Sequence, residues 1–405
     1  MPVSVVEGSR ESRRALILLA VSLILSMTTW FSASAVLPQL RALWDLSAGR
    51  AAWLTISVQL GFVAGALVSS AFNLADLIAP RRVILIGCVG AASANVLLLM
   101  ATPSTALWFR FATGFFLAGV YPPALKLMST WFRERRGFAL GIMVGALTVG
   151  SAAPHLVNGL GGANWRQVVV VTSVLTLIGG LIVELGVRDG PYPFPQGVFD
   201  PRQVGLVFRN RGVRLASLGY FGHMWELYAM WAWFVVFFAS VVGTRASSSV
   251  APLATFAVIG IGGSGCVTAG LLGDRWGRTK TTMLMMAVSG MCALVIGLAY
   301  GAPTWVVLII GLVWGFAVVA DSAQFSTMIT ELADQAYVGT ALTLQLALGF
   351  TLTVATIWLV PRIVASELGW RWAFAFLVPG PLLGIIAMRR LKNLPEAASI
   401  AGGRG

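Results

Sequence analysis

Long apolar stretches separated by short polar segments recur along the whole chain. Each stretch has about 20 residues, enough to cross a bilayer as a helix. They lie near residues 15–37, 51–72, 82–101, 104–127, 137–158 and 167–187, and then near 213–242, 250–272, 280–300, 303–329, 337–361 and 371–389. The pattern predicts an all-α membrane protein with twelve transmembrane helices.

The composition agrees with this prediction. Of the 405 residues, 58% are hydrophobic and only 11% are charged, whereas charged residues form about a quarter of a soluble globular chain. Twelve spans leave no room for a large soluble domain, so the lipid bilayer is the expected surrounding. The three Cys lie in apolar stretches and the two His are far apart. We therefore expect no metal site, no cofactor and no enzymatic activity.

The net charge of +13 does not indicate a nucleic-acid partner, because its distribution follows the membrane topology. With the N-terminus in the cytoplasm, 21 of the 28 Lys and Arg fall on the cytoplasmic side and 6 on the other side. This bias is typical of the positive-inside rule. It predicts a multi-pass protein of the cytoplasmic (inner) membrane with both termini in the cytoplasm.

A polar segment at 188–212 divides the apolar stretches into two sets of six. Four prolines in it, from Pro191 to Pro201, forbid one continuous helix. We expect a bundle of six helices over 1–187, a cytoplasmic linker over 188–212 and a second six-helix bundle over 213–405.

The loop between the eighth and ninth spans reads GLLGDRWGRTK at residues 270–280. It closely resembles the loop signature of the major facilitator superfamily, which joins the second and third helices of each six-helix half. The resemblance implies a secondary transporter for a small-molecule substrate, working by alternating access between two pseudo-symmetric bundles, as a monomer.

The same resemblance implies a gating role for this loop. Asp274 would cap a helix and pair with cations of the neighbouring bundle, and Arg275, Gly277 and Arg278 belong to the same signature. Anchoring at the membrane edge is the alternative. The first half carries a degraded copy at 72–82 that keeps Asp76 and Arg81 but has lost both glycines, so we expect most of the gate in the second half.

Ionisable residues inside apolar stretches are costly and suggest function. Arg110 resembles the Arg of the superfamily's fourth-helix motif, which assists proton or substrate coupling; the alternative is an Arg that extends to the membrane surface. His223 and Glu226 share one face of the seventh span, so they could share a proton. Asp321 in the tenth span is a second expected protonation site.

Several other polar or aromatic residues of the spans are candidates for lining a substrate path. Gln324, Gln59 and Gln345 are expected to donate to a substrate or to a neighbouring helix, and Trp233 to line a cavity. Lys126 lies close enough to the cytoplasmic edge to be only a topology signal.

The substrate is the least constrained feature. The segment VYPPALKLMSTWFRERRGFALG resembles the corresponding region of anion-handling branches, closest to cyanate and nitrate carriers. We therefore expect a small monoanion or weak organic acid, coupled to protons. The alternative is a proton-driven drug or metabolite efflux antiporter, which two buried acids among many aromatic residues would suit. A non-transporting sensor on the same scaffold is a third hypothesis.

Overall fold

A computed structural model describes residues 9–132, 136–160, 164–192, 200–243, 247–334 and 337–405; the side chains of 75, 76, 136 and 201 are also outside the description. Every regular element in these ranges is helical. The prediction of an all-α membrane protein is confirmed. Eleven helical segments of the described chain are long and apolar enough to cross a membrane.

The elements before the linker form the first six spans. They are α1 (Arg10–Ser26), η1 (Met27–Thr29), α2 (Ser32–Ala35), α3 (Leu37–Trp44), α4 (Ala48–Ala71), α5 (Leu74–Leu77), α6 (Pro80–Val96), η2 (Leu97–Met100), α7 (Pro103–Leu117), α8 (Tyr121–Ser129), α9 (Arg136–Gly159) and α10 (Trp165–Gly186). The predicted fourth span is divided into α7 and α8, which is why it is absent from the eleven long segments. Pro122 and Pro123 lack the amide donors that a continuous helix needs there.

The linker contains η3 (Pro201–Gln203) and α11 (Val204–Arg209). The second set of spans follows, with three of its six members interrupted. These elements are α12 (Arg211–Val242), α13 (Val250–Gly260), α14 (Gly262–Trp276), α15 (Arg278–Leu298), α16 (Thr304–Ala320), α17 (Ser322–Leu332), α18 (Val338–Ala365), α19 (Gly369–Ala373), η4 (Ala375–Leu377), α20 (Pro379–Lys392) and η5 (Pro395–Gly402).

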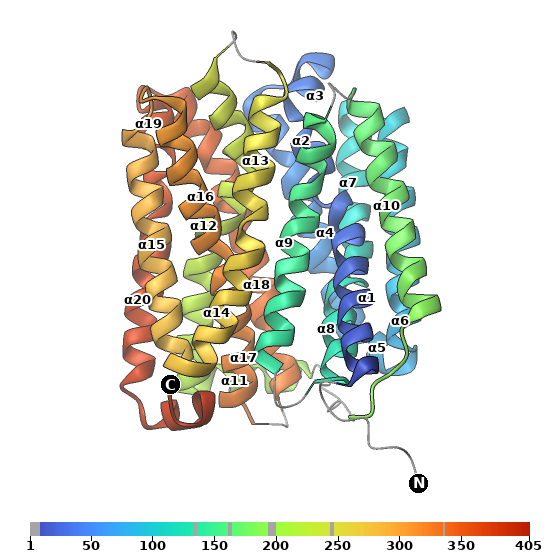
Figure 1. The fold of residues 1–405 in the computed structure, drawn as a ribbon, viewed down its shortest axis with the longest axis vertical. Coiled ribbons are helices and arrows are strands. Elements are labelled where there is room, and N and C mark those ends of the chain that lie inside the picture. Colours follow the sequence, from blue (N-terminus) through green and yellow to red (C-terminus); the bar gives the residue numbers. More distant parts are fainter. Residues whose placement is uncertain (1–8, 133–135, 161–163, 193–199, 244–246, 335–336) are drawn as a thin grey trace.

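The helices run roughly parallel, and both termini lie at the same end of the molecule (Figure 1). We call this the termini end. α4 packs against α18, and α9 packs against α13 and α14, so two helix seams join the elements before and after the linker. Figure 1 places α5, α8, α11 and α17 at the termini end.

Small residues allow the close helix approach. A Cβ atom on Gly265 would lie 2.1 Å from the carbonyl oxygen of Phe316, so α14 and α16 could not meet with any larger residue there. Gly262, Gly263 and Gly265 therefore serve the close packing of α14 on its neighbours.

Candidate functional site

A cavity of about 330 Å³ lies between the two sets of helices. It is lined by residues of α4, α8, α9, α12, α17 and α18, and it reaches the termini end at Asn73, Ser129 and Gly339. At that end the Ser70 and Thr343 hydroxyls are 3.1 Å apart across the α4–α18 seam. The cavity therefore lies between the two predicted halves and extends from the termini end into the membrane region.

The walls of the cavity are mainly aromatic and aliphatic. Tyr121, Tyr220, Tyr228, Trp231 and Phe350 line it together with Leu, Met and Val side chains. Its polar lining residues are Ser, Thr and Tyr, one Asn, one Gln and Lys126; no Asp or Glu of the described residues lines it. Lys126 thus faces the cavity and is more than the topology signal that we predicted.

A layer of aromatic rings closes the cavity on the side away from the termini. Trp30 packs on Phe62 at 4.8 Å between centroids, Phe62 on Phe350 at 4.7 Å, and Phe350 on Tyr228 at 5.0 Å. The layer joins α4 and the interrupted first span to α12 and α18. Because these rings are buried, they separate the cavity from the opposite end.

Three titratable residues are buried beside the cavity without lining it. Nδ1 of His223 lies 2.8 Å from Oδ1 of Asp321, at the point where the tenth span changes from α16 to α17. Glu226 is held separately, since Trp314 Nε1 donates to its Oε1 at 2.6 Å and the Ser289 hydroxyl donates to its Oε2 at 3.0 Å. His223 and Glu226 do not contact each other directly: His223 faces Asp321 at the end of α16, and Glu226 binds Trp314 of α16 and Ser289 of α15.

Tyr220 lies between the cavity and a group of three buried residues that we call the acid cluster (His223, Glu226 and Asp321). Its ring lines the cavity and lies 6.1 Å from the His223 ring. Ser322, the residue after Asp321, also lines the cavity. His223 Nε2 has no hydrogen-bond partner within the described chain.

Arg110 is fully buried and binds the interruption of the first span. Its Nε donates to the Leu54 carbonyl at 3.3 Å, and its Nη1 donates to the Thr29 carbonyl at 3.0 Å, to Ser32 Oγ and to Asn95 Oδ1. Its Nη2 donates to the Trp30 carbonyl. It neither extends to the surface nor lines the cavity, so a role of Arg110 in substrate coupling could not be a direct contact in the central cavity.

The remaining candidates have different surroundings. Gln345 lines the cavity, and its amide nitrogen has no partner in the described chain. Gln59 is buried with neither amide atom partnered there. Trp233 donates to the Ile357 carbonyl at 2.9 Å, and so joins α12 to α18 away from the cavity. Gln324 faces the loop at 270–280, where it accepts from Arg278 at 2.9 Å.

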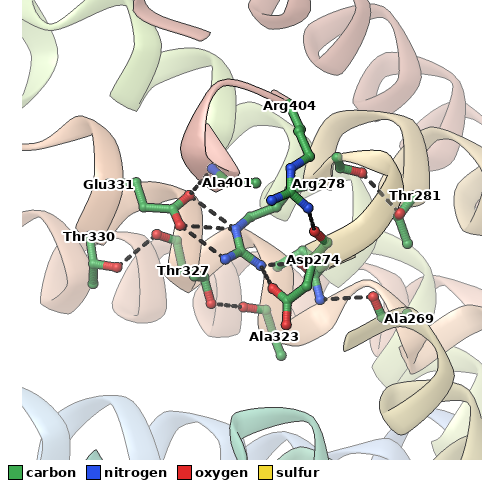
Figure 2. Close-up of polar contacts among 12 residues, drawn as sticks. Ala269, Asp274, Arg278, Thr281, Ala323, Thr327, Thr330, Glu331, Ala401 and Arg404 are labelled. Carbon is green, nitrogen blue, oxygen red and sulfur yellow. Dashed lines mark hydrogen bonds and ion pairs between the residues drawn. The ribbon is translucent and has the colours of Figure 1, made fainter. Parts of the chain in front are cut away.

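The loop at 270–280 is the centre of an ionic network (Figure 2). Arg278 is 3.3 Å from Asp274 and 2.9 Å from Glu331 at the end of α17. Glu331 also accepts from the amide of Ala401, and Arg404 donates to the Asp274 carbonyl. The segment after η5 therefore packs onto the loop. Arg275 is exposed and makes no hydrogen bond or ion pair in the described structure.

Within the described residues, the network touches the other set of helices at Gly137. A Cβ atom on Gly137, in the first turn of α9, would lie 2.7 Å from an oxygen of Asp274. Gly277 has φ +102°, which glycine adopts without strain.

In the first half, Arg81 Nε has no partner in the described chain, and the side chain of Asp76 lies outside the described residues. The prediction that the loop at 72–82 contributes less to the gate therefore stays a prediction.

Comparison with known proteins identifies the family. A sequence model of the Major Facilitator Superfamily matches residues 19–346. The chain belongs to this superfamily. Its members are transporters, and this chain is a multi-pass member. The solved structure of a D-xylose-proton symporter shares the fold: its TM-score is 0.73 at 15% identity, over 96% of this chain and 99% of that one.

Two curated relatives match parts of the chain. "MFS transporter asaE" of Aspergillus flavus is 28% identical over 55% of this chain and 50% of its own length. "Fujikurins efflux protein" of Gibberella fujikuroi is 28% identical over 39% of this chain and 34% of its own length. The match thus spans half the length of the first relative and a third of the second. These relatives do not support the cyanate and nitrate branch.

Sequence reasoning did not find Trp314, Ser289, Asn95 and Glu331 as partners of the charged groups. Trp314, Ser289 and Asn95 are ordinary residues of apolar spans, and only packing shows what they contact. Glu331 had a signal, since it is an acid within the final turn of a membrane helix. Tyr228 had a signal as one of the aromatic residues near Glu226 in the seventh span, whereas Tyr121 and Tyr220 had none.

Proposed function

We propose that this protein is a proton-driven exporter of amphipathic, aromatic organic molecules. The observation that carries the proposal is the lining of the central cavity. Tyr and Trp rings offer apolar faces with a polar edge, which suits a ligand of mixed polarity. A small inorganic anion would need strong cationic compensation, yet Arg110 is engaged by the protein itself and Lys126 is the one cationic residue of the described lining.

The topology that the charge distribution predicts places the opening of the cavity on the cytoplasmic side. With both termini in the cytoplasm, the cavity reaches the cytoplasmic face, and the aromatic layer closes it toward the outside. Rocking of the two halves along the α4–α18 and α9–α14 seams would open that layer and close the termini end. The efflux protein among the relatives supports export.

The acid cluster supplies a route for coupling to protons. An acid buried in a membrane span changes protonation only when its surroundings open, which makes it suited to couple proton movement to the rocking motion. Asp321 with His223, and Glu226 with its two donors, occupy such positions next to the cavity wall. A hydrophobic weak organic acid is a second candidate substrate, favoured by Lys126 in the cavity lining.

Transport into and out of proteoliposomes under an imposed proton gradient tests this proposal. The compounds are a cationic aromatic dye, benzoate, nitrate and cyanate. Gradient-dependent movement of the dye or of benzoate, with none of nitrate or cyanate, supports it. Movement of nitrate or cyanate that Arg110→Ala abolishes, with no movement of the aromatic compounds, would overturn it.

A further inference from the structure

A second, smaller cavity lies outside the central one, between the linker helix and the second set of spans. This groove of about 150 Å³ is formed by α11, α12 and α18. Its walls are Val, Leu, Phe and Ala side chains, with only Arg214, Ser217 and Gln345 polar. The exposed side chains of Phe208, Leu218 and Leu348 form its rim, so the groove faces the hydrocarbon of a bilayer.

The charge and length of the groove point to one kind of occupant. Arg214 is exposed in the first turn of α12, where the span begins at the termini end, and it has no ion-pair partner in the described chain. From Arg214 to Phe221 the helix rises about 10 Å, the distance from a lipid phosphate to the upper part of its acyl chains.

Gln345 supplies the groove with a buried polar group that could bind a ligand. Its side chain lines both this groove and the central cavity. It is 4% exposed, and its amide nitrogen has no hydrogen-bond partner in the described structure. A buried amide donor without a partner is costly, and an ester or phosphate oxygen in the groove would satisfy it.

We propose that the groove binds an anionic phospholipid, with the phosphate at Arg214, an acyl chain along Phe208, Leu218 and Leu344, and a lipid oxygen at the Gln345 amide. A zwitterionic lipid of the same chain length binds more weakly, because its headgroup has no net negative charge to pair with Arg214. The lipid and the substrate share the Gln345 side chain as a common wall, so occupancy of the groove alters the central cavity.

Photo-crosslinking in nanodiscs tests the lipid site independently of transport. The full chain is reconstituted with phosphatidylglycerol or phosphatidylcholine, each carrying a diazirine in the acyl chain, and labelled peptides are mapped. We expect phosphatidylglycerol to label 207–221 and 341–348, and Arg214→Gln to reduce this labelling roughly fivefold. Arg209→Gln, an exposed arginine outside the groove, is the matched control and leaves the labelling unchanged.

A second variant keeps the test decisive. Leu344→Trp fills the groove without removing a charge, and it should abolish labelling of 207–221 while the lipid belt elsewhere is labelled as before. Equal labelling by both lipids, equal effects of Arg214→Gln and Arg209→Gln, or labelling spread evenly over all spans would overturn the proposal. None of these outcomes depends on the transported substrate.

Discussion

The imidazole Nδ1 of His223 lies 2.8 Å from the Oδ1 atom of Asp321, joining α12 to the interruption of the tenth span. Both side chains are buried, so the pair is stable only if its total charge is compensated. Protonation of either residue changes that balance next to Tyr220, which lines the central cavity. The pair therefore links proton binding to the wall of the cavity.

Asp321→Asn should separate proton coupling from substrate exchange. The amide keeps the shape of the carboxyl group but cannot gain or lose a proton. We expect gradient-driven transport to fall to the level of protein-free vesicles, while exchange of labelled for unlabelled substrate without a gradient continues. Ser322→Ala, the adjacent residue that lines the cavity, is the control and should retain gradient-driven transport. Equal loss of exchange and of driven transport in Asp321→Asn would contradict this role.

Arg110→Ala should destabilise the fold more than it alters selectivity. Its removal takes one buried donor away from each of the carbonyl groups of Thr29, Trp30 and Leu54. We expect a loss of about 3 kcal/mol or more in stability, seen as a lower thermal midpoint in detergent. Arg110→Lys should also fail to restore the midpoint, because one ammonium group cannot reproduce the planar set of donors. A variant with an unchanged midpoint and lost anion transport would support a direct anion contact instead.

Gly137→Val should open the seam between α9 and the loop at 270–280. The added side chain has no room beside the Asp274 carboxylate, so either that carboxylate turns away or the first turn of α9 moves, and both weaken the contact across the seam. In a chain whose three buried Cys are replaced by Ala, Ser69→Cys reports access to the cavity through its reaction with a membrane-impermeant maleimide. We expect the cysteine at position 69 to react severalfold faster in the Gly137→Val variant than in the chain with Gly137. Gly205→Val, where a side chain meets open space, is the control. The same increase in the labelling rate in that variant would contradict the role of the seam in closing the cavity.

The two loops of the repeat should differ in importance. Asp274 belongs to the network of Arg278 and Glu331 (Figure 2), whereas the loop at 72–82 has lost its signature glycines. We expect Asp274→Asn to reduce the initial transport rate clearly more than Asp76→Asn, both measured at equal amounts of reconstituted protein. A larger loss in Asp76→Asn would place the main gate in the first half.

The helical architecture could be predicted from the sequence because the apolar length of a membrane span is a local property. Asp321, Glu226 and Arg110 stood out for a similar reason, since a charge in hydrocarbon is conspicuous in any apolar stretch. Their partners could not be predicted. His223 faces Asp321 and not Glu226, and Arg110 faces Asn95, because such contacts depend on how helices distant in sequence pack.

The interruptions of the spans were equally hard to foresee. Pro122 and Pro123 signal the break between α7 and α8, but no proline marks the one at Asp321. The sequence predicts Gln324 on the substrate path. In the structure, Gln324 lies on α17 after the break at Asp321, and its amide oxygen accepts a hydrogen bond from Arg278.

Glu226 offers the most direct test of proton coupling. Glu226→Gln keeps an oxygen that can accept from Trp314 Nε1, so the fold should survive while the titratable group is lost. Proteoliposomes containing a pH-sensitive dye report substrate-induced proton movement, with the substrate being the aromatic compound that the transport panel moves fastest. The account predicts proton movement in the unmodified protein and none in the Glu226→Gln, Asp321→Asn double variant, which still binds the compound. Undiminished proton movement in that double variant would contradict it.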